Sequence, residues 1–378
     1  MRFLGFLATI LLLTALSWLL VGTFIHDLIP GGWRTAIIAW AVSVAPLFLL
    51  IRNIATGRYP SAIVRLFAFR LFWYAQLLML PLALASAAAA LLALPFGAAN
   101  AAGRAVVLVL APLFVLLGLW GYVGSRRLVV RQVPLAPRGL PAALDGLKIV
   151  QLSDLHVGPQ TSRKQLAKIA AATRDAKPHI IAYTGDQVDD YPHDVDDLAS
   201  AFGDLTAPLG VYAIAGNHDV YAGWSEVRRA LEAMGVTVLV NRAVKLEYNG
   251  ASFWLAGTGD PAGAQFVRGD ETGAPDIART LADVPRGAFC IVLAHNPALF
   301  PSLAARGVPV VLSGHTHYGQ FSFPSKGWSL ASVFLEYAMG TYERNGSLLY
   351  ISPGTNYWGI PFRIGALPEV TVVTLESR

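Results

Sequence analysis

The sequence predicts a protein of two parts, four membrane-spanning helices followed by an α/β domain. Three observations lead to this prediction. Long apolar runs fill the first third of the chain, and each has about the 20 residues that a helix needs to cross a bilayer. The remainder contains five short apolar runs that are typical of buried strands. Clusters of acids, amides and imidazoles follow those five runs, as expected where strand ends form a ligand-binding edge of an α/β sheet.

The apolar runs define four predicted membrane helices within residues 1–126. Hydrophobic residues make up 54% of the 378 residues and charged residues only 14%, a composition that excludes a wholly soluble enzyme. The first run is too long for the apolar core of an ordinary signal peptide. The four runs are Phe3–Phe24, Trp33–Ile51, Leu71–Pro95 and Ala105–Gly124.

Charge is distributed unevenly along the chain, and this predicts the orientation of the helices. Residues 1–138 contain eleven Lys and Arg but one acid, Asp27, whereas residues 139–378 contain eighteen basic and twenty-three acidic residues. The basic excess therefore belongs to the membrane part and gives no support for nucleic-acid binding. Arginines concentrate in the second loop and after the fourth run. By the positive-inside rule, and provided that there are four spans, we expect a multi-pass cell-membrane protein with its α/β domain in the cytoplasm.

A short linker is predicted between the two parts, at residues 127–146. Prolines and glycines recur in this stretch, and both are typical of loops. The α/β domain is therefore expected at residues 147–378 and close to the bilayer. Cys290 is the only cysteine, so no intramolecular disulfide is possible.

Each of the five predicted strands leads directly into a short polar motif. The strands are Leu147–Leu152, Ile180–Thr184, Val211–Ala215, Ile291–Ala294 and Val308–Leu312. Five of the eight histidines of the chain fall in the motifs, a clustering that incidental histidines would not show. The motifs are, in order, Asp154-Leu155-His156, Gly185-Asp186, Gly216-Asn217-His218-Asp219, His295-Asn296 and Gly314-His315-Thr316-His317.

The residue types in these motifs predict a site for two divalent metal ions. Carboxylate oxygens and imidazole nitrogens suit hard or borderline ions such as Mn²⁺, Fe²⁺ and Zn²⁺, and the motifs contain no thiolate. Two such ions about 3.5–4 Å apart stabilise both the attacking and the leaving oxygen of an in-line displacement. The motifs therefore look like a two-metal hydrolytic site.

In type and order, the five motifs resemble those of the calcineurin-like metallophosphoesterase family, which read D-x-H, G-D, G-N-H-D/E, H and G-H-x-H. The resemblance covers the chain from about Leu147 onward and fits a membrane-anchored, bacterial-type member. It implies the αββα sandwich of the family and makes residues 147–378 the catalytic domain. The ligands that it implies are Asp154, His156, Asp186 and His317 for one metal, and Asp186, Asn217, His295 and His315 for the other.

Three more residues in or near the motifs are expected to act without binding metal. The resemblance implies that His218 approaches the phosphate from the leaving-group side, where an imidazole can protonate the departing oxygen. We expect Asp219 to fix the tautomer of His218. Asp189 matches an acidic position of the family that lies behind the metal ligands.

Three segments outside the motifs are less specific. The glycine-rich stretch Gly257–Pro275 lacks the Gly-Lys-Ser/Thr of a P-loop and is expected to form a flexible loop beside the site. Phe321–Tyr342 is rich in aromatic residues, for which packing in a hairpin core is the favoured interpretation and membrane contact the alternative. The glycines at 118, 121 and 124 either permit close helix packing or simply fill space, the favoured interpretation.

The sequence thus predicts a membrane-bound, dinuclear metal-dependent phosphoesterase. Expected substrates are a phosphomonoester, phosphodiester or pyrophosphate, with a lipid-linked substrate as one candidate because the domain is held near the bilayer. The expected cofactors are two divalent ions, Mn, Fe or Zn, and the expected partners are the substrate and the membrane, without nucleic acid. A transporter or sensor that binds a phosphorylated ligand without turnover is the alternative from another class. A protein phosphatase is a second alternative.

Overall fold

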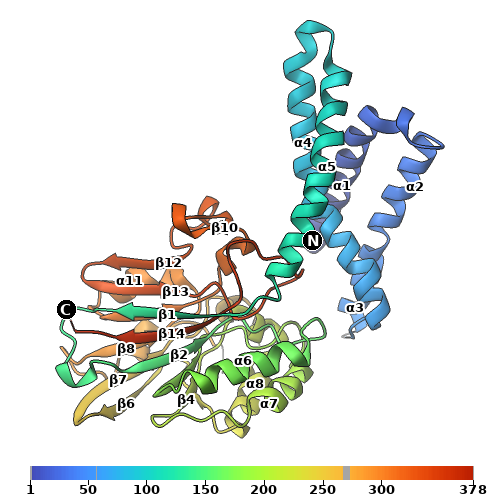
Figure 1. Cartoon of the computed structure of the whole chain (residues 1–378). Coiled ribbons are helices and arrows are strands. Elements are labelled where there is room, and N and C mark those ends of the chain that lie inside the picture. The colour runs from blue at the N-terminus through green and yellow to red at the C-terminus, as the bar shows by residue number, and fades with distance from the viewer. Residues whose placement is uncertain (1, 57, 267–272, 378) are drawn as a thin grey trace. The chain divides into compact units, whose positions relative to one another are not determined.

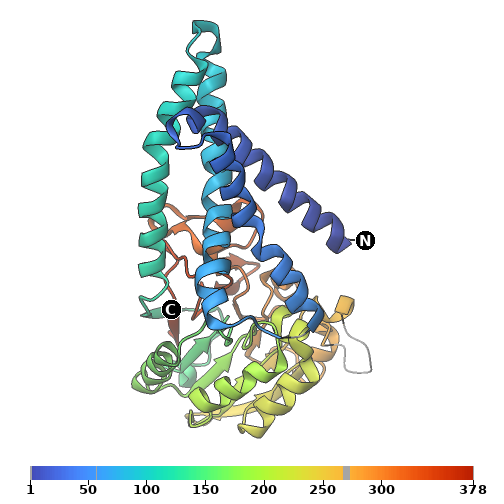
Figure 2. The same cartoon turned by 90° about the vertical axis from the view of Figure 1, so that its right-hand side faces the viewer.

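The computed structural model describes residues 2–56, 58–266 and 273–377 and divides into two compact units, Met1–Trp120 and Gly121–Arg378 (Figures 1 and 2). Part of the predicted flexible loop Gly257–Pro275, residues 267–272, lies outside the described residues. The boundary between the units falls inside the last long helix, so the final turn of that helix belongs to the second unit.

The first unit consists of long apolar helices. They are α1 (Arg2–Ile25), α2 (Trp33–Val44), α3 (Pro46–Thr56), the π-helical segment η2 (Val64–Phe69), α4 (Arg70–Ala93) and α5 (Ala99–Gly124), with 3-10 turns η1 (His26–Leu28) and η3 (Leu94–Phe96). Within the described part of the chain, four stretches are long and apolar enough to cross a membrane, which confirms the predicted number. They are Ala8–Leu28, Trp33–Asn53, Val64–Phe96 and Ala99–Gly124.

Two of these helices differ from the apolar runs of the sequence. The second stretch is divided between α2 and α3 at Pro46, because proline has no N–H to continue the helical hydrogen bonds. The third begins at Val64, earlier than expected, since helical hydrogen bonding continues through the basic residues that interrupt the apolar run. Exposed side chains on these helices include Phe67 and Leu92, and an apolar exposed surface is typical of helices in lipid.

The second unit is a sandwich of two six-stranded sheets (Figure 1). Buried apolar residues of both sheets, such as Ile149, Ile180, Ile291 and Val310, form one core cluster between them. The first sheet has the order β1 (Val129–Leu135), β14 (Glu369–Leu375), β2 (Lys148–Leu152), β3 (Ile180–Tyr183), β4 (Val211–Ala213) and β5 (Thr237–Val238). The second has the order β12 (Gly340–Arg344), β13 (Ser347–Ile351), β9 (Val310–Ser313), β8 (Cys290–Leu293), β7 (Ala251–Gly257) and β6 (Arg242–Tyr248).

Helices cover the outer faces of both sheets and complete an αββα arrangement. The first sheet is covered by α6 (Arg163–Asp175), α7 (Val195–Phe202) and α8 (Asn217–Ala233), and the second by α11 (Phe300–Ala304). The predicted fold class is therefore confirmed. The shorter elements are α9 (Gly263–Phe266), α10 (Ile277–Thr280), β10 (Ser322–Phe323), β11 (Trp328–Ser329) and the 3-10 turns η4 (Ala142–Leu144), η5 (Pro192–Asp194), η6 (Pro297–Leu299), η7 (His317–Gln320), η8 (Pro324–Lys326) and η9 (Leu330–Val333).

The predicted linker, residues 127–146, contains a strand of the first sheet. Strand β1 pairs in parallel with β14, from Val129 opposite Glu369 to Leu135 opposite Leu375. Pro134 is tolerated because β1 is an edge strand, where a missing N–H breaks no internal ladder. The second unit therefore starts before residue 147, where the α/β domain was expected to begin. Four residues separate the end of α5 from β1, the first strand of this unit.

The five strands predicted from the sequence are present as β2, β3, β4, β8 and β9. Strands β2, β3 and β4 run in parallel, as do β8 and β9. All residues of β3, β8 and β9 are buried, which explains their continuous apolar sequence. The carboxyl ends of these strands carry the polar motifs.

Candidate metal centre

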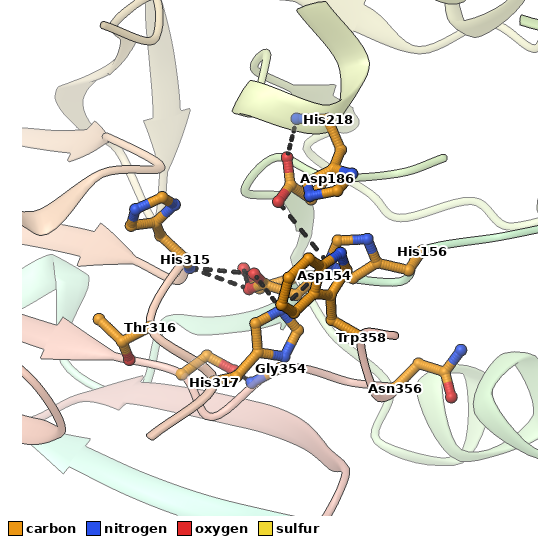
Figure 3. Close-up of polar contacts among 12 residues, drawn as sticks. Asp154, His156, Asp186, His218, His315, Thr316, His317, Gly354, Asn356 and Trp358 are labelled. Atoms are coloured by element: carbon orange, nitrogen blue, oxygen red, sulfur yellow. Dashed lines mark hydrogen bonds and ion pairs between the residues drawn. The ribbon is translucent and has the colours of Figure 1, made fainter. Parts of the chain in front are cut away.

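The motifs that follow the five strands meet at one place in the second unit. Figure 3 labels residues of all of them except His295-Asn296. Among the described residues, three groups of side chains have possible ligand atoms within 4.8 Å of one another: Asp154 with His156 and His317, Asp186 with His295 and His315, and His156 with Asp189 and His218. The first two groups contain expected ligands only. The structure thus brings together the residues that the resemblance assigned to each metal.

The first group presents nitrogen and oxygen atoms toward a common point. His317 Nε2 lies 3.2 Å from Asp154 Oδ1 and 3.0 Å from His156 Nε2. At this distance the two ring nitrogens either share one proton in a hydrogen bond or, with both unprotonated, direct their lone pairs to a place where a cation could bind. His156 Nε2 also lies 3.7 Å from Asp186 Oδ2, which connects this group to the second.

The second group includes the amide of Asn217. Its Oδ1 lies 2.8 Å from His315 Nδ1 and 3.2 Å from His295 Nε2, and that Nε2 lies 3.2 Å from Asp186 Oδ2. His295 Nδ1 lies 2.8 Å from the Thr184 carbonyl, which accepts its proton. This hydrogen bond leaves Nε2 free as the ligand atom, an orientation that metal-binding histidines commonly use.

Burial and charge in this centre fit a divalent cation. Asp154 is fully buried and Asp186 nearly so, and a buried carboxylate is costly without a positive partner. Burial opposes ionisation of Asp186, but the imidazoles of His295, His218 and His156 hold the pKa of its carboxyl well below the usual range. Burial and the Arg363 guanidinium lower the pKa of His317 well below its ordinary value, which keeps this ring neutral, as metal ligation requires.

The backbone of the centre is held in an unusual conformation. Five of the seven expected ligands have positive φ, a region that costs of order 1–3 kcal/mol per residue and that clusters at functional sites. Two glycines make room for the carboxylates, because a Cβ on Gly216 or Gly314 would collide with Asp186 or Asp154. The five φ angles are 54° for Asp154, 42° for His156, 55° for Asp186, 71° for His315 and 49° for His317.

His218 belongs to neither of the two groups of expected ligands, and its possible ligand atom lies instead near those of His156 and Asp189. Its backbone N–H donates to Asp186 Oδ1 at 2.8 Å, and its Nδ1 lies 2.9 Å from the Asp189 carbonyl oxygen. The rings of Tyr221 and Trp358 are 5.5 and 5.8 Å from the imidazole. Burial disfavours the charged form, but nearby carboxylates outweigh burial and raise the pKa of His218.

Asp219 has a different role from the one expected. Its carboxylate accepts backbone N–H groups of Asp186 and Gly216 at Oδ2 and of Gln187 and Val188 at Oδ1, at 2.8 to 3.2 Å. The expectation that Asp219 orients His218 is corrected, because the hydrogen bond at His218 Nδ1 goes to the Asp189 carbonyl. Asp219 instead fixes the loop that carries Asp186.

Two residues support the ligands: Asp189, which the resemblance placed behind the metal ligands, and Arg363, to which the sequence assigned no contact. Asp189 Oδ1 lies 3.4 Å from His156 Nδ1, and Arg363 Nη2 lies 2.8 Å from His317 Nδ1. The Arg363 guanidinium is fully buried and also donates to the carbonyl oxygens of His317, Pro353, Asn356 and Ala366. One signal was present: Arg363 is the single charged residue between Ser352 and Pro368.

Comparisons with known proteins identify related sequences. Residues 147–319 match the family model described as calcineurin-like phosphoesterase. A "Transmembrane protein with metallophosphoesterase domain" of Danio rerio is 33% identical over 247 residues, which cover 63% of this chain and 55% of that protein. An "Uncharacterized metallophosphoesterase" of Aquifex aeolicus is 30% identical over 265 residues, which cover 70% of this chain and 98% of that protein.

A third relative is the "Uncharacterized metallophosphoesterase YkuE" of Bacillus subtilis, 31% identical over 244 residues that cover 63% of this chain and 82% of that protein. The chain therefore spans just over half the length of the Danio rerio protein and nearly all of the Aquifex aeolicus one.

Proposed function

The chain belongs to the calcineurin-like metallophosphoesterase family, and we propose that it is a membrane-bound hydrolase of phosphoester bonds with a dinuclear metal centre. The observation that carries the proposal is the convergence of seven donor side chains from five separate loops. Family membership implies phosphoester hydrolysis. The proposed ligands are Asp154, His156, Asp186 and His317 for one ion, and Asp186, Asn217, His295 and His315 for the other.

The donor set supports two divalent ions of the Mn²⁺, Fe²⁺ or Zn²⁺ type, because it offers oxygen and nitrogen and no sulfur. Such ions, when bound, supply the positive charge that lowers the pKa of water and polarises a phosphoryl oxygen. Asp186 is the proposed shared ligand, since its Oδ2 faces His295 in one group and His156 in the other.

His218 is the proposed proton donor to the leaving oxygen. Its Nδ1 proton is taken up by the hydrogen bond to the Asp189 carbonyl, which leaves Nε2 to carry the transferable proton. Nearby carboxylates raise the pKa of His218, which favours the protonated form that this role requires. Asp189 thereby takes the positioning role that the sequence suggested for Asp219.

The proposed substrates are a phosphomonoester, phosphodiester or pyrophosphate, with a lipid-linked substrate favoured. The four apolar helices and the transmembrane relatives indicate membrane localisation. The excess of arginine in the second loop and after α5 supports a cytoplasmic position of the catalytic unit.

Hydrolysis by the purified full-length chain tests the proposal. p-Nitrophenyl phosphate and bis-p-nitrophenyl phosphate are compared with Mn²⁺ present and after chelation, for the wild type, Asp186→Asn and the exposed-site control Asp283→Asn. We expect metal-dependent turnover that only Asp186→Asn abolishes. Binding of a phosphorylated ligand without turnover would instead identify a sensor or transporter, and preferential turnover of phosphopeptides a protein phosphatase.

A further inference from the structure

A hairpin close to the metal centre exposes several large apolar side chains. It comprises β10, the turn η8, β11 and η9, residues 322–335. Among the described residues from 121 to 377, six of the ten exposed large apolar side chains lie in this short segment. They are Phe323, Trp328, Leu330, Val333, Phe334 and Leu335. Apolar patches of this kind mark sites of interaction with a protein partner or a membrane.

The favoured interpretation of these aromatic residues as hairpin core applies to only some of them. Tyr337 is buried, but Phe334 is 79% exposed and Phe323 is 48% exposed. Phe323 and Trp328 are opposite each other in the hairpin and their rings stack with centroids 5.8 Å apart. The two rings therefore form a preorganised apolar tip, and the exposed Lys326 lies in the turn between them.

The base of this hairpin is attached to the end of the last membrane helix, within the second unit. Phe321 bridges to Ile364, and Ser322 N–H donates to the Ile364 carbonyl at 2.8 Å. The same loop donates Arg363 N–H to the Gly121 carbonyl of α5 at 2.9 Å. The hairpin is thus separated from α5 by one loop.

The glycines of α5 permit this attachment. A Cβ on Gly121 would collide with the Phe362 ring, and a Cβ on Gly124 would collide with the Arg363 carbonyl oxygen. Gly121 and Gly124 therefore serve close packing, but against the catalytic unit. The last turn of α5, which belongs to the second unit, is the end of a candidate span, and this is the basis for expecting the membrane surface near the hairpin.

We propose that residues 322–335 dock into the bilayer interface, with Phe323, Trp328 and Phe334 in the apolar layer and Lys326 at the headgroup phosphates. Tryptophan is favoured at such interfaces, because one part of its ring is apolar and the other carries an N–H. Lysine suits the same position, since its stem packs against lipid while its ammonium group reaches the headgroups. We favour the bilayer over a protein partner, because one loop connects the hairpin to the end of α5, which is long and apolar enough to span a membrane.

Docking has a consequence for the substrate, which rests on the proposed function. The turn η7 carries His317 and leads directly into β10. At the end of that turn, the Gln320 side chain donates to the Trp358 carbonyl and accepts from its N–H, at 3.0 and 3.1 Å. Trp358 is 49% exposed and its ring lies beside His218. A docked hairpin therefore presents the metal centre to phosphoesters that carry an apolar tail in the bilayer.

Fluorescence quenching in the full-length chain tests the docking without any turnover. A fluorophore is attached at Ser325→Cys or, as a matched control, at Glu247→Cys on β6, both exposed positions. Cys290 does not compete for the label, because it is buried and burial raises the pKa of its thiol to about 12. The protein is reconstituted into phosphatidylcholine vesicles whose acyl chains carry a nitroxide near the headgroup.

We expect loss of most of the fluorescence at position 325 and little loss at position 247. Equal quenching at the two positions would overturn the proposal. Hydrolysis provides the second measurement: the triple variant Phe323→Ser, Trp328→Ser, Phe334→Ser should turn over a vesicle-embedded phospholipid substrate about 10-fold more slowly or worse, with soluble ester hydrolysis unchanged. Val130→Ser, another exposed apolar position, is the control. Equal losses on both substrates would contradict the role in substrate access, while quenching would still decide the docking.

Discussion

Replacement of Asp219 by Asn tests whether this residue holds the loop of the metal centre or orients His218. Each carboxylate oxygen of Asp219 accepts two backbone N–H groups in a fully buried position. An Asn keeps one oxygen, so two N–H groups lose their acceptor and face an amide NH₂ instead. Asp219→Asn should therefore destabilise the catalytic unit and disturb the loop of Asp186.

The magnitude follows from the hydrogen bonds that are lost. A hydrogen bond to a charged group contributes about 1.5–3 kcal/mol, so two of them amount to about 3–6 kcal/mol. Burial and the neighbouring Asp186 carboxylate raise the pKa of Asp219 to about 7. A neutral Asn at position 219 removes the repulsion from the Asp186 carboxylate. The expected loss of unfolding free energy therefore lies near the lower end of this range, at about 3 kcal/mol.

Thermal unfolding of the full-length protein in detergent is the assay, together with its metal content. A loss of about 3 kcal/mol lowers the midpoint by about 6–12 °C for a unit of this size. The control Asp283→Asn changes an exposed carboxylate and should leave the midpoint within about 1–2 °C of the wild type, as is usual for surface changes. The reasoning is refuted if Asp219→Asn keeps the wild-type midpoint and metal content but slows turnover, since that result would assign the residue to His218 after all.

Four further predictions concern the metals, the acid, the helix end and the topology. Asp186→Asn should deplete both ions, whereas His156→Ala should chiefly weaken one; two ions per chain and full activity in purified Asp186→Asn would contradict the shared ligand. His218→Ala should retain metal and lose about 10²–10⁴-fold in rate, with a smaller loss on p-nitrophenyl than on alkyl esters, and an equal loss on both ester types argues against the acid role. Gly124→Ala should cost about 1–3 kcal/mol by overpacking on Arg363, measured by thermal unfolding against Gly118→Ala, whose Cβ would have ordinary contacts. Reporter fusions at the C-terminus that are active only outside the cytoplasm should stay silent, and a signal would reverse the proposed orientation.

The sequence alone was sufficient for the number of spans, the fold class and the set of residues that converge. Each of these depends on local information, because the length of an apolar run, the buried character of a strand and the polar motif after it are all contained in a few consecutive residues. Parallel strands of one sheet end at the same edge, so the order of the motifs was enough to place Asp154 and Asp186 together after β2 and β3. His295 follows β8 of the second sheet, and the packing of the two sheets brings it to Asp186.

Only the tertiary structure decided which residues each side chain contacts. Strand β1 was not predicted within the expected linker, because its partner strand β14 is far away in the sequence. The Arg131 guanidinium, for example, donates to Glu369, 238 residues later. Asp219 lies next to His218 in sequence, yet it lies in the first turn of α8 with its carboxylate toward the loop of Asp186.

The environments of Arg363 and of the hairpin at residues 322–335 were likewise decided by the tertiary structure. An isolated arginine and a run of aromatic residues are compatible with a solvated loop or a packed core. Their environment depends on what the rest of the chain places around them. Folding buries Arg363 against His317 and leaves Phe334 exposed, and both outcomes depend on contacts between segments that the sequence separates.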